Sequence, residues 1–344
     1  MRIFINGFGR IGRCVLRALA AAPERWPGVR VAGINDIAAP ETCAHLFEFD
    51  SVFGAWRGSV ALEDGALVVD GRTIPMHRTP DLSTLDLTGV DLVMECTGRA
   101  DSRAVAARGL AAGAGRVLIS GPSAAAEATV VLGGNDQVIA GQRILSNASC
   151  TTNALAPVLR RLDEGWGVLT GSMTTVHCYT GSRPTVDAPG PGLARSRAAA
   201  LSMVPTTTSA ARLVDSVLPQ LAGRIVAQAV RVPVASVSCI DLVVQTARPA
   251  TAEAVNAAFR EPGGVIGAID RALVSSDLRG RPESVVMACP ETRVTPQGLL
   301  RVFGWYDNEW GFSNRMLDMA TRLSPVPPDP AAFPMAPVSR GEAR

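Results

Sequence analysis

The chain has 344 residues, of which 47% are hydrophobic and 19% charged, and its formal net charge is +2. At roughly 100–200 residues per domain, this length predicts two domains, and the composition excludes a disordered chain. The near balance of charge gives no reason to expect nucleic acid as a partner, and no apolar run approaches the roughly 20 residues that cross a bilayer, so a membrane partner is not expected either.

The first half of the chain alternates short apolar strands with helical segments. Residues 2–6 are expected to form a strand at once, without the basic and apolar stretch of a secretory signal, and we therefore expect a cytoplasmic protein. A helical segment at 15–22 and a second strand at 29–35 complete a βαβ unit.

The same alternation continues to about residue 149. Further strands are expected at 60–64, 66–70, 91–98 and 116–122, and a helix at 102–114. Alternating strands and helices are typical of an α/β fold with a Rossmann-type doubly wound sheet, which we assign to residues 1–149.

The second half is richer in long β-type runs. Strands are expected within 167–180, 224–234, 236–247 and 299–307, with only a few helical segments such as 251–261. This pattern predicts an α+β domain with a mostly antiparallel sheet.

Three boundaries follow from this reading of the second half. The second domain is placed at 150–313, and residues 314–323 are expected to form a helix that returns to the first domain. Residues 324–344 are a Pro-rich tail that is expected to be loosely ordered.

A glycine motif lies between the first strand and the first helix. Gly7, Gly9 and Gly12 allow, in turn, a tight turn, close approach of a pyrophosphate, and close packing of helix on strand. Asp36 ends the next strand, where a carboxylate accepts hydrogen bonds from ribose hydroxyls and repels a 2′-phosphate. The sequence therefore predicts an NAD site, with a mere Gly-rich turn as the alternative.

Seven scattered cysteines contain no CxxC pair, so neither a disulfide framework nor a metal site is expected. Cys150 differs from the others because it lies between small hydroxyl residues, just before a predicted helix whose N-terminus would stabilise a thiolate. It is the candidate nucleophile. Four cysteines lie in apolar runs and are expected to be buried structural residues: Cys14, Cys43, Cys96 and Cys239.

The chain has three histidines, and one of them could act with this cysteine. His45 lies in a helical segment and His77 in an expected loop. His177 ends a β-run of the second domain, where an interdomain cleft would meet the cofactor. A Cys–His pair is suited to covalent chemistry at a carbonyl carbon, although a packed strand histidine is an equal alternative from spacing alone.

Seven segments, in order along the chain, resemble the phosphorylating (type I) glyceraldehyde-3-phosphate dehydrogenase family. They are NGFGRIGR at 6–13, ND at 35–36, SNASCTTN at 146–153, YTG at 179–181, RAAALSMVPTTT at 197–208, RVP at 231–233 and WYDNEWGFSNR at 305–315. The resemblance implies a homotetramer of two-domain subunits, each with an NAD-binding and a catalytic domain.

The resemblance also implies roles for individual residues. Cys150 would be the nucleophile and His177 its acid–base partner, while Asn308 would fix the nicotinamide carboxamide. The other positions matching cofactor contacts are Arg10, Ile11, Asp36, Arg78 and Ser120, beside the glycines Gly7, Gly9 and Gly12. Those matching anion sites are Ser149, Thr151 and Thr208 for inorganic phosphate, Thr180 and Arg231 for the substrate phosphate, and Arg195 near both.

The chain departs from the family pattern at several points. Ser182 replaces a carboxylate, Ser209 replaces a glycine that lines the phosphate site, and Ala154 replaces a second cysteine. Residues 190–192 read Gly-Pro-Gly in place of His-Lys-Asp. All basic residues are arginine, so any role of a family lysine must fall to arginine or be lost.

The implied function is the glycolytic oxidation and phosphorylation of glyceraldehyde 3-phosphate to 1,3-bisphosphoglycerate, with NAD and a cysteine thioester. The partners would be a small phosphorylated aldehyde and inorganic phosphate. The alternatives are an erythrose-4-phosphate dehydrogenase that uses water as acceptor, and a specialised paralogue that resists an inhibitor or uses arsenate. A non-catalytic NAD-binding regulator would be expected to lack Cys150, His177 or Asn308, and all three are present.

Overall fold

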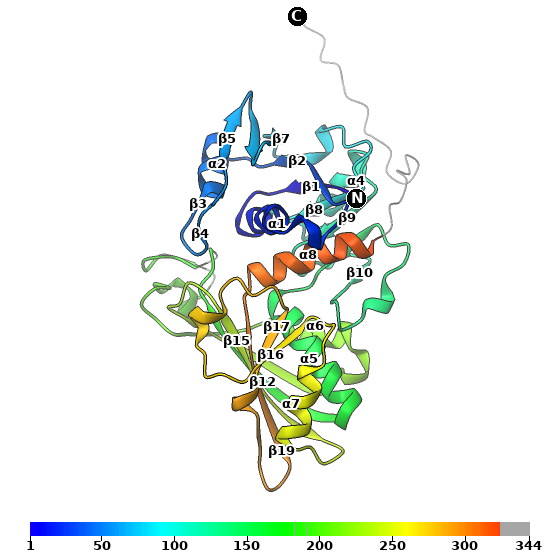
Figure 1. Ribbon diagram of the computed structural model, residues 1–344, viewed down its shortest axis with the longest axis vertical. Helices are drawn as coiled ribbons and strands as arrows, with labels where there is room; N and C mark the ends of the chain where they lie inside the picture. Colours follow the sequence, from blue (N-terminus) through cyan, green and yellow to red (C-terminus); the bar gives the residue numbers. More distant parts are fainter. Residues whose placement is uncertain (182, 191, 324–344) are drawn as a thin grey trace, which may run out of the picture.

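The computed structural model describes residues 1–181, 183–190 and 192–323, so the predictions for the tail and for Ser182 and Pro191 fall outside the described residues. The structure has two lobes, each built on one sheet, and the long helix α8 (Trp310–Arg322) lies between them, as Figure 1 shows. Helix α5 (Cys150–Trp166) is the first element of the second lobe. None of the described helices is both long and apolar enough to cross a membrane.

The first lobe is an α/β sheet with the strand order β10-β11-β9-β8-β1-β2-β7-β6-β5. All pairings from β10 to β7 are parallel, which confirms the Rossmann-type sheet. Its strands are β1 (Arg2–Asn6), β2 (Arg30–Asn35), β5 (Val60–Glu63), β6 (Ala66–Val69), β7 (Arg72–His77), β8 (Leu92–Glu95), β9 (Arg116–Ile119), β10 (Ala128–Thr129) and β11 (Ile144–Ser146). Its helices are α1 (Arg10–Ala21), α2 (Pro40–Glu48), α3 (Arg103–Ala106) and α4 (Arg108–Ala111), and β3 (Phe49–Asp50) and β4 (Gly54–Ala55) form a separate ribbon.

Two local predictions for this lobe were wrong. His77 ends strand β7 and does not lie in a loop, because β7 pairs in parallel with β2 and antiparallel with β6 although its sequence has few strand-forming residues. The helix expected at 102–114 is two four-residue helices. In the second of them Gly109 packs directly on the sheet, where a Cβ atom would lie 2.9 Å from Val93.

The second lobe has the strand order β13-β14-β12-β15-β19-β17-β16, with β18 also paired to β19. Only the pairings β12–β14 and β16–β17 are parallel, so the predicted mostly antiparallel sheet is confirmed. The strands are β12 (Val168–Cys178), β13 (Val204–Thr206), β14 (Ile225–Val232), β15 (Ser238–Thr246), β16 (Ile266–Ile269), β17 (Val285–Ala288), β18 (Arg293–Val294) and β19 (Leu299–Tyr306). Helices α5, α6 (Ala210–Val217) and α7 (Ala252–Arg260) lie along one side of this sheet in Figure 1 and share its apolar core.

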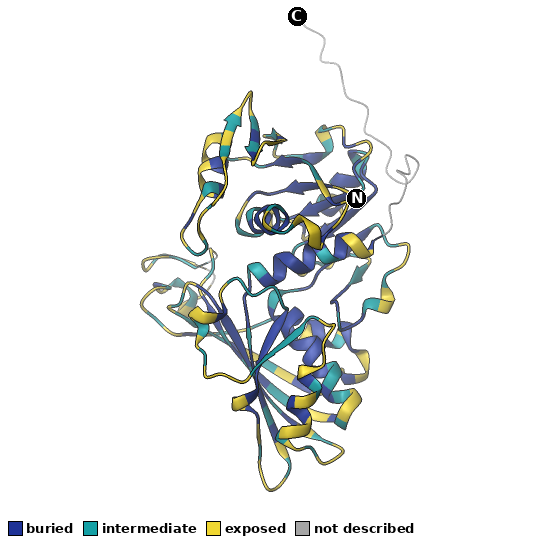
Figure 2. Ribbon diagram, in the orientation of Figure 1, coloured by how far each residue is buried: buried dark blue, intermediate teal, exposed yellow. Residues whose placement is uncertain are grey.

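Helix α8 lies between the two lobes. It begins directly after the last strand of the second sheet, and its apolar side chains Phe312, Met316 and Leu317 pack into the core of the first lobe with Ile3 and Val15. Figure 2 shows most of this helix as buried. Residues at the start of α8 therefore sit where both lobes meet, beside the ends of β1 and β12.

Candidate active site

The glycine motif forms one end of the candidate site. Gly7 has φ +92°, and a Cβ atom there would lie 2.7 Å from the amide nitrogen of Thr97. A Cβ atom on Gly12 would lie 2.2 Å from the carbonyl oxygen of Gly7, whereas one on Gly9 would meet nothing within 4 Å. The turn and the helix packing thus both require glycine, while the backbone at Gly9 is open to a ligand at the N-terminus of α1.

A hollow, here called the glycine hollow, runs from this turn across the ends of β1, β2 and β8. It is lined by Asn6, Gly7, Gly9, Asn35, Asp36, Ile37, Thr79, Pro80, Leu82, Glu95, Cys96, Thr97, Arg99, Val105 and Arg108. Asp36 is held at its rim because its carboxylate accepts hydrogen bonds from the backbone N–H groups of Phe8 (2.7 Å) and Ala38 (2.8 Å). These residues fit NAD, because a fixed carboxylate and an open helix N-terminus are what ribose hydroxyls and a pyrophosphate require.

Two predicted cofactor residues, Gly12 and Arg78, are not among the described residues that line this hollow or the next. Gly12 instead packs against Gly7 in the turn, as described above. Nε of Arg78 donates to the backbone oxygen of Ile37, at the rim of the glycine hollow. Arg10, in contrast, forms ion pairs with Asp50 and Glu309.

A second hollow, the central hollow, lies where the lobes meet. It is lined by Arg10, Ile11, Ser120, Gly121, Pro122, Ser149, Cys150, His177, Thr180, Gly181, Arg231, Asn308, Glu309 and Phe312. The structure therefore brings most of the predicted cofactor, catalytic and substrate-phosphate residues to one place, from segments almost 300 residues apart in the sequence.

Cys150 is the first residue of α5 and follows its N-cap. Ser149 caps the helix by accepting a hydrogen bond from the backbone N–H of Thr152 at 3.0 Å. Asn153 holds the preceding turn because its Nδ2 donates to the backbone oxygens of Asn147 and Ser149. The sulfur lies 3.6 Å from Nε2 of His177, near the end of β12, so the expected Cys–His pair is in contact.

The surroundings of this pair change the pKa values of both Cys150 and His177. Burial raises the pKa of Cys150, while the positive charge of Arg231 and hydrogen bonds from Thr151 lower it. Burial, followed by the charge of Arg231, lowers the pKa of His177 to about 3. His177 is therefore neutral near pH 7 and can act as a base.

Nδ1 of His177 has two polar partners, Arg231 and the backbone oxygen of Cys178. His177 and Arg231 are register partners on β12 and β14, and Nη1 of Arg231 lies 2.5 Å from Nδ1 of His177 and 3.0 Å from the backbone oxygen of Cys178. Nδ1 also lies 2.8 Å from the Cys178 oxygen. A guanidinium only donates and a carbonyl oxygen only accepts, so Nδ1 carries the ring hydrogen when it bonds this oxygen and lacks it when it bonds Arg231.

A third hollow, the arginine hollow, shares Ser149, Cys150, His177 and Arg231 with the central hollow. It is lined by Ser149, Cys150, Thr151, Thr175, His177, Arg183, Arg195, Thr206, Thr207, Thr208, Ser209, Ala229 and Arg231. Arg195 is braced by the hydroxyls of Thr206 and Thr207, each at 3.0 Å. No carboxylate is among the described residues of this lining, so hydroxyls and guanidinium groups make it an anion site by composition.

Two predicted phosphate residues have particular local settings. Ser209 has φ −77°, a conformation that needs no glycine. The Thr151 hydroxyl is 2.9 Å from the hydroxyl of Tyr306, which also bonds Thr175 at 2.8 Å. Tyr306 packs edge-on to His177 and was missed by the sequence analysis, although it lies in the segment at 305–315.

Asn308 is oriented by two residues that the sequence analysis also missed. Its Oδ1 accepts hydrogen bonds from Cys178 Sγ at 3.0 Å and from Ser238 Oγ at 3.1 Å. Oδ1 is thereby turned to the protein, and Nδ2 is the end of the amide that can serve a ligand in the central hollow.

The other cysteines follow the prediction with one exception. Cys14, Cys43 and Cys239 are buried, as expected. Cys96 is only half-buried and lines the glycine hollow, because it lies one residue beyond the end of β8. No group of three or more potential metal-ligating side chains occurs within residues 1–181, 183–190 and 192–323.

Comparison with known proteins gives a consistent result over both lobes. Residues 1–103 match the NAD binding domain of glyceraldehyde 3-phosphate dehydrogenase, and residues 149–308 match its C-terminal domain. A glyceraldehyde-3-phosphate dehydrogenase of Pseudomonas aeruginosa is 47% identical over 330 residues, covering 94% of this chain and 98% of that protein. The glyceraldehyde-3-phosphate dehydrogenase of Cereibacter sphaeroides is 44% identical, and glyceraldehyde-3-phosphate dehydrogenase 1 of Bacillus subtilis is 40% identical. Both alignments cover 94% of this chain and 98% of the relative.

Proposed function

The chain belongs to the glyceraldehyde-3-phosphate dehydrogenase family and is an NAD-dependent dehydrogenase, and from this premise we propose that it converts glyceraldehyde 3-phosphate to 1,3-bisphosphoglycerate through a thioester on Cys150. The observation that carries the proposal is the 3.6 Å contact between Cys150 Sγ and His177 Nε2, set between the central and the arginine hollow. One hollow can hold an aldehyde beside a nicotinamide, and the other an anionic acceptor.

Each part of the chain has a place in this proposal. Residues 1–149 bind NAD, with Gly7, Gly9, Gly12 and Asp36 at the nucleotide and with Arg10, Ile11, Arg78 and Ser120 along it. Residues 150–313 form the catalytic part and 314–323 return to the first lobe. Asn308 donates its Nδ2 hydrogen to the nicotinamide carboxamide.

The covalent steps use Cys150 and His177. Nε2 of His177 takes the proton of Cys150, and the thiolate adds to the aldehyde carbon to give an alkoxide. Protonated His177 returns the proton to this alkoxide, which gives the hemithioacetal and leaves His177 neutral. His177 accepts the hydroxyl proton as the thioester forms, for which NAD, when bound, supplies the hydride acceptor. A phosphate oxygen then attacks the thioester carbon, the C–S bond breaks, and the acyl phosphate leaves with the thiolate restored.

The substrate phosphate has a second task in this scheme. For Nε2 to accept a proton, Nδ1 must carry the ring hydrogen and donate to the Cys178 oxygen, which requires Arg231 to turn away. A phosphate bound by Thr180 and Arg231 provides the opposite charge that draws the guanidinium off the ring. We thus assign Arg231 to both binding and tautomer control.

The acceptor phosphate is assigned to the arginine hollow. Ser149, Thr151, Thr208 and Ser209 line it and Arg195 is braced at its edge, as the anion-site positions of the sequence require.

Dependence on phosphate tests the proposed function directly. With NAD and glyceraldehyde 3-phosphate, steady NADH formation should require inorganic phosphate, while a single-turnover burst should remain without it, because thioester formation precedes phosphate attack. Stopped-flow absorbance of NADH and identification of the product measure both.

Two other outcomes would replace the proposal. If steady turnover is independent of phosphate and the product is a free acid, water is the acceptor, as in an erythrose-4-phosphate dehydrogenase. If purified protein binds NAD but shows no burst with the aldehyde, it is a non-catalytic NAD-binding protein.

The orientation of Asn308 leads to a further prediction. Replacing Cys178 and Ser238 together by alanine should raise the KM for NAD about 30-fold, since two hydrogen bonds worth about 1 kcal/mol each no longer fix the amide. The KM for the aldehyde should change little. The control is Cys239→Ala, which removes a buried thiol on β15 that does not bond Asn308 among the described contacts. An equal rise in the KM for NAD in that variant would assign the effect to packing.

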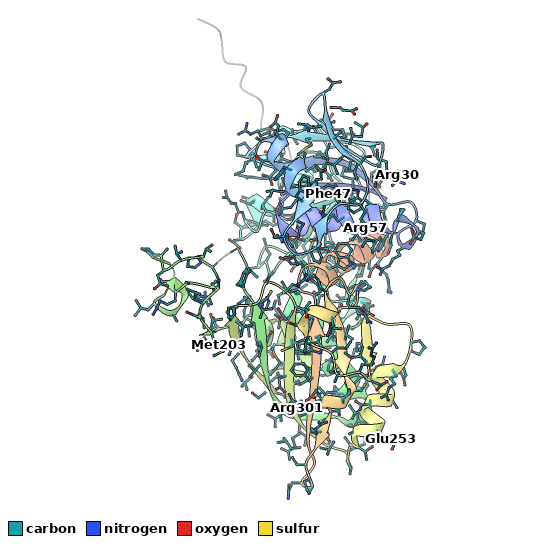
Figure 3. All side chains as sticks on the ribbon, turned by 60° about the vertical axis from the view of Figure 1, so that its left-hand side comes forward. Arg30, Phe47, Arg57, Met203, Glu253 and Arg301 are labelled. Carbon is teal, nitrogen blue, oxygen red and sulfur yellow. The ribbon has the colours of Figure 1, made fainter. Side chains whose placement is uncertain are left out.

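We further propose that the protein is a homotetramer. Large apolar side chains are exposed in the segment between β12 and β13, namely Val186 (71%), Leu193 (93%), Leu201 (85%) and Met203 (75%). Figure 3 places Met203 beside a lobe that projects from the second sheet. Several large apolar side chains exposed within one short segment favour a subunit contact there.

A further inference from the structure

Arg183 is the one guanidinium in the arginine hollow to which the reading of the sequence gave no role. It lies five residues beyond Cys178, the last residue of β12, and lines the hollow together with Arg195, Arg231 and the threonines at 206–208. Its Nη1 is buried and has no hydrogen-bond partner among the residues that the structure describes.

The charges around Arg183 are unbalanced. Burial, and then the charges of Arg231 and Arg195, hold its pKa below the usual value. Arg197, later in the same segment, contrasts with it because that guanidinium is paired with Asp187 at 2.8 Å. Three guanidinium groups that face one hollow, with no carboxylate in its described lining, repel each other until an anion enters.

Resting on the proposed function, we propose that Arg183 is a third anion-binding arginine of the acceptor site, where its free Nη1 donates to a doubly charged tetrahedral oxyanion such as inorganic phosphate. The planar fork of a guanidinium suits two oxygens of such an ion, and a charge-assisted hydrogen bond is roughly twice as strong as a neutral one.

The hollow that Arg183 lines decides which of the two phosphates it serves. It shares the arginine hollow with Arg195, Thr208 and Ser209, whereas Thr180 and Asn308 line the central hollow without it. Arg183 should therefore act on the attacking phosphate and not on the phosphate of the aldehyde. Sulfate and arsenate, which have the same shape and charge, should compete there.

The test compares Arg183→Gln with Arg212→Gln. The first variant removes the charge from the hollow, and the second removes an equal charge from an exposed position on α6 that is not among the described residues of the lining. The KM for phosphate should rise about tenfold in Arg183→Gln alone, the loss expected for one charge-assisted hydrogen bond. The KM values for aldehyde and NAD, and the phosphate-free burst of NADH, should stay within about twofold.

A binding measurement keeps this test separate from the proposed function. The thermal unfolding midpoint of the whole protein is followed against inorganic phosphate, without aldehyde or NAD and at constant ionic strength. Arg183→Gln should need about tenfold more phosphate for half of the stabilisation. If Arg183→Gln and Arg212→Gln need the same phosphate concentration for half of the stabilisation, Arg183 does not bind phosphate. In the kinetic test, a rise in the KM for the aldehyde without a rise in the KM for phosphate would also overturn the proposed role of Arg183. An enzyme that uses water in turnover but shows the shifted titration would refute the phosphate acceptor while supporting Arg183 as an anion-binding residue.

Discussion

Cys150→Ala should abolish the oxidation of glyceraldehyde 3-phosphate, with a loss of roughly 10⁴-fold or more in kcat, and should leave NAD binding within about twofold. The loss is large because the covalent route disappears when its nucleophile is removed. NAD binding is spared because the glycine turn and Asp36 lie at the other hollow. NADH formation and equilibrium binding of NAD measure the two effects.

Cys96 supplies the control for this substitution. It is half-buried and lines the glycine hollow, and burial raises the pKa of its thiol to about 12. Cys96→Ala should retain activity, and iodoacetamide should modify Cys150 first in the unaltered protein, as peptide mass mapping would show. First modification of Cys96 with loss of activity would contradict the assignment of the nucleophile.

NADP should be a poor substitute for NAD, with kcat/KM lower by roughly 10²–10³. Asp36 cannot easily move away from a 2′-phosphate, because two backbone N–H groups hold its carboxylate in place. Two unit charges about 4 Å apart interact by roughly 4 kcal/mol at intermediate dielectric, which is an upper guide to this discrimination. Steady-state kinetics with each dinucleotide gives the ratio.

Asp36→Asn tests the cause of that preference, since it removes the charge and keeps an oxygen for the ribose. The ratio of kcat/KM for NAD to kcat/KM for NADP should fall by about tenfold or more in this variant. Asp64→Asn, at an exposed turn, should leave that ratio unchanged. Arg99 and Arg108 also line the glycine hollow, and Arg108 lies 3.3 Å from Asp81. Comparable kcat/KM for both dinucleotides in the unaltered protein would mean that these arginines outweigh Asp36.

The features that the sequence by itself determined are those written in short contiguous segments. Gly7, Gly9 and Gly12 are spaced by the turn that they form, and Cys150 is placed by the helix that follows it. The strongly apolar strands and the helix after Asn308 are specified in the same way, because period, capping and turn chemistry depend on near neighbours along the chain. The family motifs lie in these segments, and so the fold class, the cofactor and the reaction type could be predicted.

Only the tertiary structure decided the contacts between segments. Strand β7, which ends in His77, forms because β2 and β6 offer it partners on both sides, not because its own residues favour a strand. Cys96 faces a hollow because of where β8 ends. Such outcomes depend on pairing and packing over long sequence separations, which local patterns do not encode.

The site shows the same division. Sequence named Cys150, His177 and Arg231, but the 3.6 Å Cys–His contact and the hold of Arg231 on Nδ1 depend on how α5, β12 and β14 pack together. Two further features could be seen only in the folded chain. Cys178 and Ser238 orient the Asn308 amide, and Arg183 lies in the arginine hollow. Side-chain direction and charge balance are set by neighbours in space, and in this protein those neighbours are brought from both lobes and from opposite ends of the sequence.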